Sequence, residues 1–167
     1  MRVIVLFLAV VLVVSCKSDK VKSSEPTANV QETPKGASKF DLESLPESEM
    51  LRLYNEATYV DYIFYDLPFS LSQDNKPSIH SNLKLISSLP LDFLPTTCKP
   101  IGREFFHIGG EIVHEADLYF SEGCFGYVFL KDQKPIYANK LTEGGMKFYA
   151  NIISQSQKMA NQAVNGQ

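Results

Sequence analysis

Cys98 and Cys124 are the residues of this sequence with the most definite chemistry, because two cysteines in an oxidising compartment can form a disulfide. The alternatives are a reactive thiol or a metal pair, and neither Cys-x-x-Cys spacing nor a nearby histidine supports them. If one strand of a predicted sheet separates the two cysteines, they lie about 10 Å apart, which exceeds the reach of a disulfide. The proline-flanked connector before Cys98 can fold across that gap, and we predict that the bond forms.

Two of the three histidines lie on either side of a predicted hairpin turn at Gly109-Gly110. A two-residue turn there makes His107 and His114 diagonal neighbours on one face of the hairpin, beside Arg103. A zinc site needs further ligands, and the third histidine, His80, belongs to a distant predicted helix. We therefore expect partly buried, hydrogen-bonded histidines and no metal site.

The same register puts Glu104 opposite Glu115 on the other face of that hairpin, with Glu111 and Asp117 nearby. Directly opposed like charges destabilise a sheet, so a lysine, a partner's basic group or a hard cation such as calcium should compensate them. A register error is an equally good explanation, since a one-residue slip changes every facing pair. We interpret Glu104 and Glu115 as a candidate interaction surface and not as a glycosidase pair.

A second candidate interaction surface is the series Tyr59, Tyr62 and Tyr65, which recurs every three residues. Tyrosine suits interfaces because its ring is apolar and its hydroxyl is polar. The alternative is a helix that packs these rings on a sheet and leaves the hydroxyls at the edge.

The sequence contains no recognised motif for catalysis, phosphate binding, dinucleotide binding, calcium binding or haem attachment. Its 167 residues are enough for one ordinary domain. The net charge of −3 argues against a protein that binds nucleic acid by neutralising phosphates. The sequence thus favours a binding domain over an enzyme, and it predicts no cofactor.

The N-terminus predicts export from the cytoplasm. Val3 to Val14 form an unbroken apolar run, which as a helix spans about 18 Å and is too short for about 30 Å of hydrocarbon. That length is typical of a signal peptide. The residues that follow it, 13–17 (VVSCK), resemble the lipobox of bacterial lipoproteins. The resemblance implies cleavage after Ser15, diacylglycerol on the Cys16 sulfur and usually an acyl chain on its new amino group; the alternative is an ordinary secretory signal.

Residues 17–40 are polar and lysine-rich, with a net charge of +2, whereas the chain from Asp41 onward has a net charge of −6. Such a segment buries too little apolar surface to fold, so we expect a disordered tether. Lysine after the lipidated cysteine implies, by resemblance, the outer membrane of a Gram-negative bacterium. The predicted organisation is a signal peptide (1–15), the lipidated Cys16 and tether (16–40), one domain (41–155) and a frayed C-terminal tail (156–167).

The domain is predicted to be α+β. Apolar residues at helical spacing favour one helix from Ser44 to Leu67 and a second from Asn75 to Leu89, which together form an N-terminal helical hairpin. Residues 59–65 are aromatic and β-branched and also fit a strand. Four β-type runs, at 101–108, 111–120, 124–131 and 135–139, predict a four-stranded antiparallel meander. A last helix from Thr142 would pack on the sheet.

Two further segments, YVDYIFYDLPFS (59–70) and CKPIGREFF (98–106), resemble small uncharacterised lipoproteins of the Bacteroidota, a resemblance that implies no activity. We expect a membrane-anchored cell-envelope lipoprotein whose domain binds another envelope protein or takes part in assembly. The first alternative is a carrier of small apolar ligands, which needs a pocket of roughly several hundred Å³ between helices and sheet. The second is an enzyme of unrecognised type, which needs a cleft that contains His107, His114 and an acid.

Overall fold

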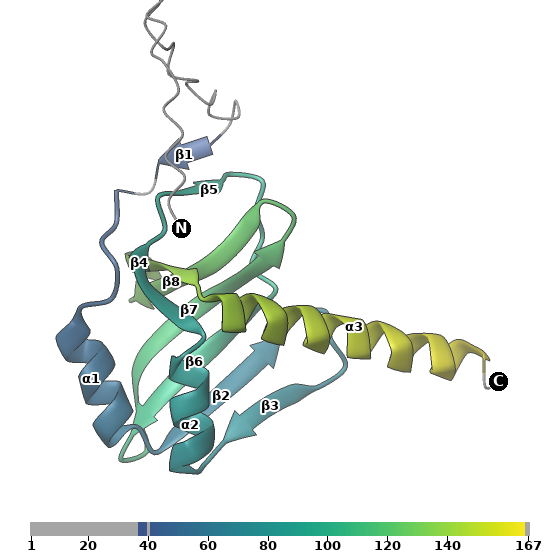
Figure 1. The fold of residues 1–167 in the computed structure, drawn as a ribbon, viewed down its shortest axis with the longest axis horizontal. Coiled ribbons are helices and arrows are strands. Elements are labelled where there is room, and N and C mark those ends of the chain that lie inside the picture. The colour runs from purple at the N-terminus through teal and green to yellow at the C-terminus, as the bar shows by residue number, and fades with distance from the viewer. Residues whose placement is uncertain (1–36, 40, 166–167) are drawn as a thin grey trace, which may run out of the picture. The chain divides into compact units, whose positions relative to one another are not determined.

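The chain is shown in Figure 1 as a computed structural model that describes residues 37–39 and 41–165, with side chains for 41–162. The predicted signal peptide, Cys16 and most of the predicted tether lie outside the described residues. The end of the tether segment is described: its backbone forms β1 (Ala37–Lys39), which pairs antiparallel with β5 (Phe93–Pro95).

The domain is α+β, and its largest element is one antiparallel sheet of seven strands in the order β3-β2-β6-β7-β8-β9-β4. The strands are β2 (Tyr59–Phe64), β3 (Ser70–Gln73), β4 (Ile86–Pro90), β6 (Gly102–Ile108), β7 (Glu111–Ser121), β8 (Cys124–Lys131) and β9 (Lys134–Leu141). The four predicted runs are β6 to β9, paired in sequence order. The predicted four-stranded size is wrong, because three further strands extend this centre on both sides.

The predicted N-terminal helical hairpin is wrong because both helices end early. The helix α1 (Glu47–Glu56) and the helix α2 (Lys76–Leu83) are each followed by a strand, β2 and β4 respectively. In β2, Val60, Tyr62 and Phe64 are buried while the residues between them are more exposed, which is the two-residue period of a strand. The amide of Thr58 donates to the carbonyl of His107 at 2.8 Å, and β2 then pairs with β6. If α1 continued past Glu56, these hydrogen bonds to β6 could not form.

The predicted C-terminal helix is confirmed as α3 (Glu143–Asn165), and it continues through the segment expected to fray. Its first half packs on the sheet through the buried Tyr149, whereas residues 157–162 are exposed and project past the sheet edge (Figure 1). None of the helices in the described residues has the length and apolar character needed to cross a bilayer.

The two faces of the sheet are covered differently. The helices α1, α2 and α3 pack on one face, here called the helix face, over a core that includes Leu53, Phe106 and Phe129. On the other face, the connector 91–98 packs mainly on β8 and β9 and also against Tyr119 of β7, with a core of Leu91, Leu94, Cys124, Val128, Leu130 and Ala138. The remaining part of this second face, on β2, β6 and β7, is here called the open face.

A β-bulge in β7 decides which side chains reach which face. Phe106 of β6 pairs with His114, and the next residue, His107, pairs with Ile112, so Val113 has no partner in this ladder. Because of this extra residue, the side chains of β7 that follow the bulge point to the opposite face from the one that an unbroken alternation would give them.

Candidate functional site

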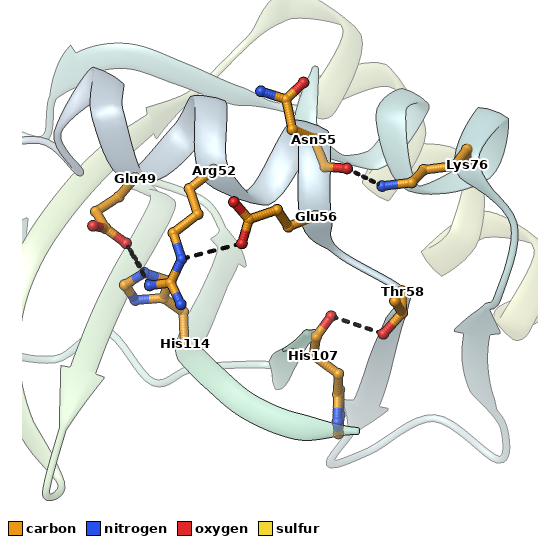
Figure 2. Close-up of polar contacts among 8 residues, drawn as sticks. All are labelled: Glu49, Arg52, Asn55, Glu56, Thr58, Lys76, His107 and His114. Atoms are coloured by element: carbon orange, nitrogen blue, oxygen red, sulfur yellow. Dashed lines mark hydrogen bonds and ion pairs between the residues drawn. The ribbon is translucent and has the colours of Figure 1, made fainter. Parts of the chain in front are cut away.

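The bulge separates the two histidines that the sequence places together, so the prediction of a shared face is wrong. His107 lies on the open face, where its ring meets the edge of Tyr59 at 5.4 Å between centroids. His114 lies on the helix face, and its Nε2 is 3.1 Å from Glu49 Oε2 of α1. Figure 2 shows His114 reaching toward Glu49 while His107 points away from the helix. The cleft with both histidines that an enzyme would need is therefore not formed.

The predicted pairing of Glu104 with Glu115 is also wrong, for the same reason. Glu104 pairs with Ala116 on the helix face, and Glu115 pairs with Phe105 on the open face. The carboxylates that do lie close together on the open face are Glu115 and Asp117, and an arginine compensates them.

That arginine is Arg103, which joins three neighbouring side chains on the open face. Its Nε donates to Asp117 Oδ1 at 2.7 Å, and its Nη1 donates to Glu115 Oε2 and to Gln133 Oε1, each at 3.1 Å. The hydrogen bond to Asp117 raises the pKa of Arg103, which is held as a cation. The acidic sheet face predicted from the sequence is thus partly neutralised from within the fold.

The three tyrosines do not form one stripe, because they belong to a strand and its extension rather than to a helix. Tyr59 and Tyr65 lie on the open face, where Tyr65 is 50% exposed, and Tyr62 is buried in the helix-face core. Burial, followed by the charge of Asp117, raises the pKa of Tyr65. Tyr59, Tyr65 and Glu115 therefore share one surface, and Tyr62 and Glu104 do not belong to it.

Sequence reasoning missed a buried polar cluster around Glu104. Its side chain is fully buried, and its Oε1 accepts hydrogen bonds from the hydroxyls of Tyr127 at 3.0 Å and Tyr149 at 2.5 Å. Tyr62 also faces this carboxyl, and Asn82 adjoins it without a hydrogen bond of good geometry. Burial raises the pKa of Glu104 to about 7, although these polar neighbours act in the opposite direction. The signal that could have found it is the alternation of β6, in which Glu104 shares a face with Phe106.

A surface groove of about 720 Å³ lies at the end of the sheet, beside the start of α1. It lies beside the first residues of β7, which extend past the C-terminal end of β8. One wall is Glu49, and the rest of the lining combines apolar with ionisable side chains: Ile112, Val113, His114, Glu115, Leu130, Lys131, Ile136 and Tyr137. The hydrogen bond from His114 lowers the pKa of Glu49, which keeps this carboxyl ionised at the rim. No sequence signal marks this groove, because it depends on the bulge and on unequal strand lengths.

Large side chains fill the space between the helices and the central strands of the sheet, where a carrier of apolar ligands would need its pocket. These side chains, including Tyr62, Phe106, Leu118, Tyr127 and Phe129, are at most 1% exposed. A smaller groove of about 460 Å³ lies toward the β4 edge of the sheet, beside the start of α1. The groove of about 720 Å³, in contrast, is open at the surface and includes five ionisable residues. These properties fit the docking of another molecule better than the enclosure of an apolar one.

Cys98 and Cys124 form the predicted disulfide, with their Cα atoms 5.8 Å apart. The bond ties the connector to the start of β8, where both cysteines join the small second core. The connector thereby stays over β8 and β9, and Ile63 and Tyr65 on the open face remain about half exposed.

Comparison of the chain with protein-family models, with curated proteins and with solved structures finds no match.

Proposed function

We propose that this chain is a membrane-anchored cell-envelope lipoprotein whose α+β domain binds another envelope protein. The observation that supports this most is the groove at the end of the sheet, which is open and lined by apolar and charged side chains together. Such a mixed, accessible lining is typical of protein recognition. The adjoining open face, with Ile63 and Tyr65 about half exposed, adds apolar surface on the same domain.

The arrangement of ionisable groups favours binding over catalysis. His114 is bonded to Glu49, and Arg103 is bonded to Asp117 and Glu115. Each of these ionisable groups is thus bonded to a partner within the domain. Glu49, His114 and Glu115 also line the groove, so these hydrogen bonds hold them in place on a surface that a partner can contact.

In-cell chemical crosslinking of the full chain tests the binding proposal. We expect adducts that contain a second, different protein, and fewer of them when a charge enters the groove through Ile112→Lys. The matched control is Leu89→Lys on β4, because Ile112 and Leu89 are similarly exposed, at 56% and 58%. Recovery of the monomer alone would contradict the proposal.

A fatty-acid labelling experiment tests the anchor. The variant Cys16→Ala should lose the label, because the lipobox resemblance assigns the thioether to that sulfur. The double variant Cys98→Ala with Cys124→Ala is the matched control and should remain labelled. Labelled Cys16→Ala protein would rule out lipid attachment at this cysteine.

A further inference from the structure

The first residues of β7 have a strand neighbour on one side only. β7 pairs with β6 from Glu111 onward, but its pairing with β8 starts at Glu115, opposite Leu130. Within the described residues, Glu111–His114 are therefore not paired with any strand on the β8 side, and this unpaired edge is here called the notch. A free edge presents unpaired backbone N–H and C=O groups, which an extended segment of another chain can satisfy.

The notch lies in the groove, which provides contacts for side chains as well as for backbone. Ile112, Val113 and His114 belong both to the notch and to the groove lining, and Leu130 and Ile136 add apolar surface. Four strand residues correspond to about 13 Å of extended chain. A groove of about 720 Å³ is large enough for several side chains of such a segment.

The charges around the notch favour a basic segment. Glu111 begins the notch and belongs to none of the ion pairs in the described residues, whereas Glu49 and Glu115, which line the groove, are already bonded to His114 and Arg103. Lys131 is the lysine of the lining. The domain from Asp41 onward has a net charge of −6. Complementary charge steers association and disfavours acidic partners.

We propose that the notch binds an extended segment of a partner protein as an added strand, with apolar side chains that alternate with basic ones. This inference rests on the proposed binding function and names its partner class. Backbone hydrogen bonds to Glu111–His114 provide affinity, and the groove selects the side chains on one side of the added strand.

Synthetic peptides test the backbone part of the proposal. The probe is a short fluorescent peptide that alternates valine with lysine, mixed with the full chain in detergent. Two further versions carry N-methyl groups on the odd or on the even amides. Because only alternate amides of an added strand face the notch, one methylated version should lose about tenfold in affinity and the other should not. Equal affinities for both methylated versions would overturn strand addition.

Protein variants and a second probe test the location and the charge preference. Ile112→Lys should weaken binding of the valine–lysine peptide about tenfold, whereas Leu89→Lys on β4 should leave it unchanged. A peptide with glutamate in place of lysine should bind more weakly than the original. Loss of binding in both protein variants, or in neither, would overturn the assignment to the notch, as would stronger binding of the glutamate peptide.

The outcomes also separate this inference from the proposed function. If in-cell crosslinks identify a partner but both methylated peptides bind equally, a partner binds without adding a strand. If no partner is recovered, the binding function itself fails. A homodimer in sedimentation that Ile112→Lys dissociates, without peptide binding, would assign the notch to a second copy of the chain and contradict the proposal.

Discussion

At the scale of single residues, Glu104 shows how a charged residue type can belong to the core. Its carboxyl lies among the hydroxyls of Tyr62, Tyr127 and Tyr149, and no described ion pair includes it. Transfer of an ionised carboxylate to such surroundings is costly, so the neutral acid is favoured. The cluster joins β2, β6 and β8 to α3, and it therefore contributes to the seating of that helix.

The raised pKa of Glu104 predicts how stability depends on pH. The pKa is about 7 in the folded chain and 4.5 ordinarily, so the folded state binds this proton more tightly. Its contribution is fully present below pH 4.5 and is lost as the pH rises through 7, by about 3 kcal/mol in total. Denaturant unfolding of the wild type should show this decline, and Glu104→Gln should lack it. An equal decline in both proteins would contradict the assignment to Glu104.

At the scale of elements, the sequence predicted the centre of the sheet because its signals are local. Turn residues such as Gly109-Gly110 separate runs that alternate between buried and exposed positions, and β6 to β9 follow those runs. The sequence did not predict β2, because Val60 and Phe64 are four residues apart. This spacing fits one face of a helix and also one face of a strand, on which every second residue is buried. The choice depends on backbone partners in β6, which are distant in the chain.

The candidate site was less predictable than the fold, because it depends on one unpaired residue. Ile112 and Val113 are both apolar, so nothing in their types marks the bulge that separates His107 from His114. A single inserted residue changes every facing pair. The sequence therefore identified Tyr59, Tyr65 and Glu115, which do lie on the open face. It could not show that Tyr62 and Glu104 are buried on the other face.

The first turn of α3 provides a matched pair of glycine substitutions. A Cβ at Gly145 would lie 2.6 Å from the carbonyl oxygen of Leu85, whereas at Gly144 its nearest contact is Thr142 Oγ1 at 3.6 Å. We expect Gly145→Ala to lower the free energy of unfolding by about 1–3 kcal/mol. Gly144→Ala should raise it by about 0.5 kcal/mol, because alanine favours helix. Chemical denaturation measures both, and similar values for the two variants would show that α3 does not begin against Leu85 as described.

At the scale of the whole molecule, the disulfide joins the sheet to a connector that buries Leu91 and Leu94 against it. The bond closes a loop with a sequence separation of 26. Replacement of both Cys98 and Cys124 by serine should lower the free energy of unfolding by about 3–4 kcal/mol. Equilibrium unfolding measures this loss, and reduction of the wild type should lower its stability by a similar amount. A negligible loss in both experiments would show that the connector packs independently of the bond.

The whole molecule combines an α+β core with a groove at the end of its sheet, which we propose as the binding site for a partner protein. The most direct test is photo-crosslinking in cells, with a photoreactive amino acid placed at Ile112 in the groove or at Leu89 on β4. We predict that Ile112 gives a discrete adduct with another protein and that Leu89, although similarly exposed, does not. No adduct at Ile112, or the same adducts from both positions, would contradict the proposal that the groove binds a partner protein.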